Sequence, residues 1–261
     1  MIFPVVKDNY VSETILVESF IDAKPISDYI TTKHVMNPLI AKNGMNILYR
    51  MIFYENFVHG DCHAGNILVQ VKKGIPIQPS LRERLENYIA FDLVPAIMSL
   101  ASKNKAVSNK QFVNDGSYDI KLAFIDAGMV TSLSEKDQYN FFQLAWSIIN
   151  RDALTCSKVI KGLTVKEIQA GVLESLDNEL NSLFETINKV AIPDINVGTT
   201  IMSILNISAV HGIKFEGNLG VLLTQLITLE GIARGLDPDI NIIGSTMPFL
   251  INRQIKNSFQ N

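Results

Sequence analysis

Two short polar segments of the chain carry the residues best suited to chemistry. The first holds a carboxylate, Asp61, and a carboxamide, Asn66, directly before the apolar run Ile67–Val71. The second begins at Asp126, directly after the strand-like run Lys121–Ile125. Phosphoryl transfer from a nucleotide needs a carboxylate that orients or deprotonates the acceptor and oxygen ligands for Mg²⁺, of which one or two are usually protein carboxylates. The residue types favour Asp61 as the base and Asn66 and Asp126 as Mg²⁺ ligands.

A simpler interpretation of the same residues exists. Asp and Asn in loops commonly end turns or cap helices, which would make Asp61 and Asp126 turn residues and Asn66 a cap. The order of the segments favours the chemical interpretation. A His-x-Asp loop with an Asn five residues after the Asp, placed before one strand, and an Asp-x-Gly after another strand have the order of the catalytic and metal-binding loops of the kinase-like fold.

The elements that must position these loops are predicted to be mostly helical. Helical spacing begins at Ser27 and continues to Phe53, with one apolar stripe formed by Met45, Leu48 and Ile52. After Asp126 the helical pattern continues to about residue 235. It is interrupted near Pro193 and at Gly212, and it contains a stripe of Leu219, Leu222, Leu223 and Leu226. Short strands are predicted at 14–17, 67–71 and 121–125. Residues 74–118 interrupt this pattern of elements and are predicted to be an insertion.

Composition excludes several classes of protein. The chain has 261 residues, 47% of them hydrophobic, and a formal net charge of -3. This apolar content excludes a disordered chain, and the absence of a basic excess argues against nucleic-acid binding. We expect a soluble protein that is mainly α with a few short β-strands.

Four stretches resemble one known family, the UbiB/aarF-domain (ABC1-type) atypical kinases. The stretch MIFYENFVHGDCHAGNILVQ resembles its catalytic loop, which usually reads HADxHPGNILV, and KLAFIDAGM is similar to its LIDFGM loop. LLTQLITLEGIARGLDPDINI resembles its C-terminal helix, and SETILVESFIDAKPI resembles its hinge strand. The four motifs stand in the family's order, so the resemblance spans residues from about 10 to 245, apart from the insertion.

The resemblance implies a protein-kinase-like C-lobe that binds ATP and Mg²⁺. Asp61 would be catalytic, Asn66 and Asp126 would bind the metal and nucleotide, and His63 would belong to the same loop. The main chain around Glu18 and Phe20 would meet the adenine. The resemblance further implies a mitochondrial protein of quinone or lipid metabolism, with a membrane surface or quinone-biosynthesis proteins as partners besides the nucleotide.

The sequence also departs from the family pattern. Gly60, Ala64 and Ala127 stand where the family usually has Ala, Pro and Phe. Residues 1–43 contain no glycine, and Lys7 is the only lysine before the hinge segment. The small lobe is therefore expected to be largely missing, with residues 1–26 a remnant of hinge strand and linker and 27–261 the C-lobe. Without that lobe, much of the positioning and charge stabilisation is lost, so the chain alone is expected to be inactive.

Two other functions stay open on these residues. One is a truncated pseudokinase that acts as a scaffold without catalysis. The other is an aminoglycoside- or choline-type small-molecule phosphotransferase, which uses a similar HGDxHxGN loop but lacks the LEGIARGLDPD helix.

Several residues near the motifs are expected to be structural. His59 is predicted to pack and hydrogen-bond, and Cys62 to be a small filler, since no basic residue flanks it to lower its pKa. Glu230 and Arg234, four residues apart, are predicted to pair on one helix.

Overall fold

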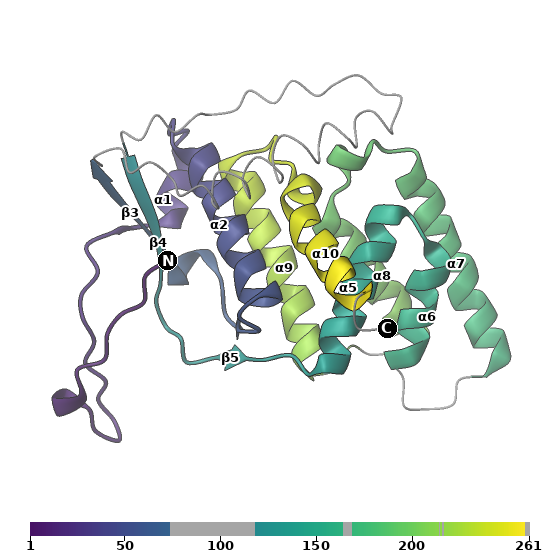
Figure 1. Cartoon of the computed structure of the whole chain (residues 1–261), viewed down its shortest axis with the longest axis horizontal. Helices are drawn as coiled ribbons and strands as arrows, with labels where there is room; N and C mark the ends of the chain where they lie inside the picture. Colours follow the sequence, from purple (N-terminus) through teal and green to yellow (C-terminus); the bar gives the residue numbers. More distant parts are fainter. Residues whose placement is uncertain (74–117, 164–168, 214, 216, 259–261) are drawn as a thin grey trace.

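The chain forms a helical body with a small β region at one end (Figure 1). The structure is a computed structural model and describes residues 1–73, 118–163, 169–213, 215 and 217–258. The described α-helices are α1 (Ile26–Thr31), α2 (Asn37–Phe53), α5 (Glu135–Asn150), α6 (Ala153–Leu163), α7 (Ala170–Asn188), α8 (Val197–Val210), α9 (Gly217–Leu236) and α10 (Ile242–Ser258). The predicted fold class, mainly α with a few short strands, is confirmed.

Two small antiparallel sheets make up the β region. The first has the order β1-β3-β4, with β1 at Lys24–Pro25, β3 at Ile67–Lys73 and β4 at Tyr118–Phe124. The second pairs β2 (Val58–His59) with β5 (Val130–Thr131). In the first sheet Ile67 lies opposite Phe124 and Lys73 opposite Tyr118. The strands predicted at 67–71 and 121–125 are thus present, and each is longer than its apolar residues alone indicate.

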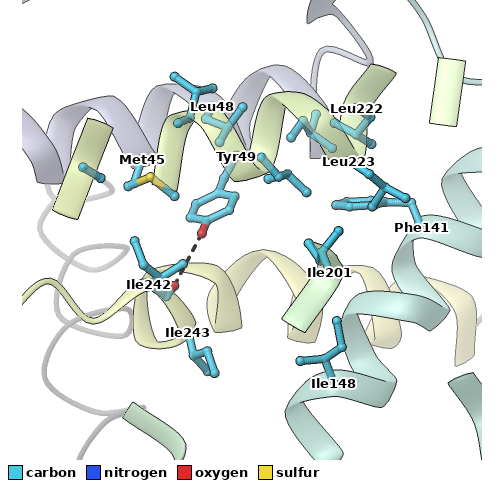
Figure 2. Close-up of a cluster of buried hydrophobic side chains, with 14 of the residues drawn as sticks. Met45, Leu48, Tyr49, Phe141, Ile148, Ile201, Leu222, Leu223, Ile242 and Ile243 are labelled. Carbon is cyan, nitrogen blue, oxygen red and sulfur yellow. Dashed lines mark hydrogen bonds between the residues drawn. The ribbon is translucent and has the colours of Figure 1, made fainter. Parts of the chain in front are cut away.

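The core lies where α2, α9, α5, α8 and α10 meet (Figure 2). The core residues Met45, Leu48 and Tyr49 of α2 and Leu222 and Leu223 of α9 are all buried. Of these, only Tyr49 lies outside the predicted stripes. The Tyr49 hydroxyl donates to the carbonyl of Ile242 at 3.4 Å. Each fully buried leucine of this kind contributes about 2 kcal/mol by leaving water. Helix α9 alone, among the described helices, has the length and apolar composition to cross a membrane, but it packs here against α2 and α8.

The helix predicted from Ser27 to Phe53 is two helices rather than one. Thr32, at the end of α1, has an extended backbone, and Pro38 lies in the first turn of α2, a position that suits proline. The buried amide of Asn37 donates to the carbonyls of Tyr29, at 2.7 Å, and Thr32, at 3.2 Å. These bonds satisfy the carbonyls that α1 leaves free at its end and hold the corner.

The short buried strand predicted at Thr14–Val17 is wrong. All four residues are exposed and none is in a strand, and the next residue, Glu18, makes an isolated bridge with Val6. The amide of Lys7 donates to the carbonyl of Val17 at 2.8 Å, so residues 5–7 are the neighbours of this segment. A β-branched run favours extended backbone, but a strand is buried only where a sheet or helix covers it, and neither covers this one among the described residues.

The predicted insertion lies outside the described residues except for Tyr118, where β4 begins. The interruptions predicted in the helical half are present. A short 3-10 helix spans Ile192–Asp194, and Gly212 has a φ of 76°.

Candidate functional site

Strand pairs bring the two polar loops together. The amide of Ile125 donates to the carbonyl of Asn66 at 3.0 Å, which extends the β3–β4 ladder by one step. Asp126 is the next residue, so it follows directly from the residue paired with Asn66. On the other side the amide of Gly60 donates to the carbonyl of Met129 at 2.7 Å, beside the β2–β5 pair. Residues 60–66 and 126–129 are therefore held against one another at both ends.

The main chain at Asp61 is hydrogen-bonded on every side. The Asp61 amide donates to Nδ1 of His59 at 3.2 Å. Its carbonyl accepts from the amide of His63 and from Nδ2 of Asn66, both at 3.0 Å. The imidazole of His59 is buried, and its ring lies 6.1 Å from that of Phe124. The predicted structural role of His59 is confirmed, since its acceptor nitrogen holds the loop.

The carboxylate of Asp61 faces solvent while it remains oriented. Its side chain is 48% exposed, and Oδ2 lies 3.3 Å from Nδ2 of Asn66 and 3.8 Å from Nε2 of His63. The Nδ1 of His63 accepts from the amide of Gly65 at 3.0 Å, which fixes that ring over the turn. This arrangement can present one carboxylate oxygen to a bound acceptor.

Asn66 and Asp126 carry the side-chain oxygens that could hold Mg²⁺ together with phosphate oxygens. Asn66 is buried and its amide nitrogen is occupied by Asp61, so its Oδ1 is the atom left to accept or coordinate. The exposed Asp126 has a φ of 58°, and its Oδ1 accepts from the amide of Gly128 at 3.4 Å. Within the described ranges no group of three or more His, Cys, Asp or Glu side chains could hold a metal. One carboxylate and one amide suit an ion that phosphates also bind.

Glu18 and Phe20, predicted to meet the adenine, lie apart from these contacts. Phe20 is 92% exposed, and the main chain of Glu18 pairs with Val6. No hydrogen bond, ion pair or ring contact in the described part of the chain joins either residue to residues 60–66 or 126–129. The segment after them does reach the sheet, because Nε2 of Gln70 on β3 donates to the carbonyl of Asp22 at 3.1 Å.

Cys62 is a buried filler, as predicted. Burial, with the charge of Asp61 adding to it, raises the pKa of the thiol to about 12, so it stays protonated at neutral pH. The pair of Glu230 and Arg234 is also present, with Nε of Arg234 donating to Oε1 of Glu230 at 2.8 Å. Glu230 is buried and accepts from the amide of Gly198 at the start of α8. Both residues are structural in this arrangement.

Sequence reasoning missed Gln225. This residue lies on the buried face of α9, and its side-chain amide bonds to the main chain of Gly60 and Cys62 at 2.8 Å each. The signal was present in the sequence. Gln225 is a lone amide among the stripe residues Leu222, Leu223 and Leu226, and a polar residue on such a face must find a buried partner.

Comparison with known proteins identifies the family of the chain. Residues 1–160 match the model of the ABC1 atypical kinase-like domain, and residues 180–241 match that of the UbiB helical domain. The chain belongs to the ABC1 atypical kinase-like family. The family resemblance read from the four motifs is therefore confirmed over most of the chain.

Relatives of this ABC1 chain occur in eukaryotes and bacteria. It is 28% identical over 98% of its length to a mitochondrial ABC1 family protein of Schizosaccharomyces pombe, of which it covers 37%. It is 27% identical over 98% of its length to a probable serine/threonine-protein kinase of Dictyostelium discoideum, of which it covers 40%. A probable protein kinase UbiB of Erwinia tasmaniensis is 23% identical over 95% of the chain, and the chain covers 38% of it. The chain thus spans about two-fifths of the length of these relatives.

Proposed function

We propose that this chain carries the catalytic and metal-binding loops of an ATP-binding atypical kinase or ATPase. Asp61 is the catalytic carboxylate, Asn66 and Asp126 hold Mg²⁺ on the phosphates, and His63 lines the same site. The observation that carries the proposal is the register of β3 and β4. It sets Asn66 beside Ile125 and hence next to Asp126, while Asn66 also bonds to Asp61.

The chemistry asked of these residues is modest. Phosphoryl transfer depends mainly on positioning and on charge stabilisation. The bound Mg²⁺ would supply the charge that offsets the phosphates. Asn66 would contribute its Oδ1, Asp126 its carboxylate, and Asp61 would orient the acceptor hydroxyl or water and accept its proton. Glu18 and Phe20 would bind the adenine through their main chain. In the structure they lie on an exposed segment, so this part of the proposal requires that segment to close over the nucleotide.

For the whole protein we propose a mitochondrial location and a role in quinone or lipid metabolism, with a membrane surface or quinone-biosynthesis proteins as partners. The names of two relatives support it. The Schizosaccharomyces pombe and Saccharomyces cerevisiae relatives are both named as mitochondrial ABC1 family proteins. The bacterial relatives named UbiB show that the family is not confined to mitochondria.

The test is calorimetric titration of the purified whole protein that contains this chain with ATP, with and without Mg²⁺, together with measurement of ATP turnover. Asp126→Ala should abolish the Mg²⁺-dependent part of binding, and Asp61→Ala should keep binding but lower turnover by about 100-fold or more. Asp119→Ala is the matched control, because Asp119 lies on the same strand β4 and is partly exposed, paired with Lys121 at 3.3 Å. Binding of ATP that is equal with and without Mg²⁺, or unchanged in Asp126→Ala, would contradict the metal assignment.

The same titration separates the alternatives. A scaffold without catalysis would show no Mg²⁺-dependent turnover in any variant. A small-molecule phosphotransferase would show turnover that rises with an aminoglycoside or choline. Because the two matched family models are the ABC1 and UbiB domains, we favour the ABC1-type reaction.

A further inference from the structure

The side chain of Gln225 on α9 bonds to the main chain on both sides of Asp61. Its Oε1 accepts from the amide of Cys62, and its Nε2 donates to the carbonyl of Gly60, both at 2.8 Å. The residue is 9% exposed. It comes from a helix 163 residues further along the chain than Cys62, so it is a tertiary contact and not a local turn.

These two bonds complete the hydrogen bonding of the two peptide groups that flank Asp61. In the Gly60–Asp61 peptide, the carbonyl accepts a hydrogen bond from Gln225 and the amide donates one to Nδ1 of His59. In the Asp61–Cys62 peptide, the amide donates a hydrogen bond to Gln225 and the carbonyl accepts one from Asn66. Rotation of either peptide would break a bond at each end. The backbone torsions of Asp61 are therefore fixed, while its carboxylate remains 48% exposed.

We propose that Gln225 is a positioning residue, which fixes the orientation of the Asp61 carboxylate through the main chain without touching the substrate. The inference rests on the proposed function for its catalytic consequence, but the loop geometry it predicts does not. Holding a reacting group in place in this way contributes to rate, because small displacements of it are costly.

Only a side chain with a donor and an acceptor can make both bonds. Leucine at 225 would leave the Cys62 amide and the Gly60 carbonyl buried and unpaired. An ionised glutamate can accept from Cys62 but cannot donate to Gly60, whereas a protonated glutamate can do both. Burial raises the pKa of such a carboxyl. Gln225→Glu should therefore regain the native loop as the pH falls.

The experiment introduces Gln225→Leu and Gln225→Glu into the whole protein and compares each with wild type, and Leu222→Ala serves as the matched control. Leu222 is fully buried on the same helix, so its loss weakens the fold without removing a bond to the loop. Turnover of Mg-ATP is measured below the melting temperature of every variant. Gln225→Leu should lower kcat by about 10- to 100-fold with KM for ATP within about threefold, and Leu222→Ala should keep kcat within about threefold.

The pH profile of Gln225→Glu supplies a readout that a purely structural role would not move. Its kcat relative to wild type should rise at least about threefold between pH 8 and pH 6. The titratable residues of the loop, which are His59, Asp61, Cys62 and His63, are common to both proteins and cancel in this ratio. A flat ratio, or a Gln225→Leu variant with kcat within twofold of wild type, would overturn the inference. If Gln225→Leu does not fold, the pH profile of Gln225→Glu decides alone.

Absence of measurable turnover in the wild-type whole protein would contradict the proposed function, and the loop geometry would then decide this inference. The amide resonances of Asp61, Cys62 and His63 should then shift in Gln225→Leu and in Gln225→Glu at pH 8. They should stay in place in Leu222→Ala and move back toward wild type in Gln225→Glu at pH 6. Resonances that do not respond to Gln225→Leu or Gln225→Glu would overturn it.

Discussion

The loops 60–66 and 126–129 meet at one site but are held in different ways. In the first, the main chain around Asp61 is bonded to side chains from its own loop and from α9. In the second, strands hold the two ends, and Asp126, Ala127 and Gly128 between them are exposed. The acid of the first loop is thus located by the helical core, and the acid of the second by strand register alone.

The largest expected consequence of this difference is in amide hydrogen exchange. The amide of Cys62 is buried and donates a hydrogen bond to Gln225, whereas that of Gly128 makes a 3.4 Å bond to Oδ1 of Asp126 at the surface. Exchange at Cys62 requires the loop to separate from α9, so its protection factor should exceed that of Gly128 by about 1,000-fold or more. Two-dimensional NMR after dilution into D₂O measures both amides in one sample. Equal protection would mean that the loops are equally mobile and would remove the distinction.

The alkaline pH dependence of stability sharpens the comparison at the thiol of Cys62. Its pKa is about 12 in the folded chain, against an ordinary value of 9.0. Between these values the unfolded chain has lost the proton and the folded chain has kept it. The contribution of this thiol to the free energy of unfolding is therefore complete below pH 9 and is lost as the pH rises toward 12. Cys62→Ala should reduce this fall by roughly 1 kcal/mol per pH unit in urea titrations.

Cys156→Ala is the control for that measurement. Cys156 is buried in α6, away from the loops, and burial also raises its pKa to about 12. Cys156→Ala should reduce the alkaline fall in the free energy of unfolding by a similar amount. If only Cys156→Ala does so, the thiol of Cys62 ionises in the folded state and the first loop is open to solvent.

A smaller effect is expected at the second loop. Asp126 has a φ of 58°, in the left-handed region where side chains other than glycine are disfavoured. Because only one weak bond uses its carboxylate, Asp126→Gly should raise the free energy of unfolding by up to about 1 kcal/mol while it removes Mg²⁺-dependent binding. Chemical denaturation measures the first effect and calorimetry the second.

Asn56→Gly is the contrast for this variant. Asn56 has a φ of 47°, but its side chain donates to the carbonyl of Leu133 and accepts from its amide, both at 2.9 Å. Loss of two bonds should outweigh the relief of strain and destabilise the chain by about 1–2 kcal/mol. A comparable loss in Asp126→Gly would show that Asp126 supports the fold, and the loop would no longer differ from the first in this respect.

Local sequence signals predicted much of what lies inside one element or one motif. The strands that flank the loops were found because an apolar run next to a polar loop is a local pattern, and the helical stripes of α2 and α9 were found from their period. The residues of the site were predicted because phosphoryl transfer needs few groups in a known order. Their roles remain predictions.

The failures have a common physical cause. Thr14–Val17 has the composition of a buried strand, but burial depends on what covers it, and no described element does. The corner between α1 and α2 depends on the tertiary position of Asn37. Gln225 carried no prediction, because its partner lies in a segment far away in the sequence. Each depends on a contact between distant segments, which periodicity does not report.

The distance in sequence between Gln225 and the loop also sets an order of events during synthesis. Residues 60–62 emerge from the ribosome 163 residues before the side chain that bonds to Cys62. At roughly 5–20 residues per second, that interval is about 8 to 33 s. Throughout it the main chain beside Asp61 lacks two of its bonds, so the nascent chain completes its acidic loop only after α9 has docked. A truncation before residue 225 would yield a chain with both acidic motifs and an unfinished site.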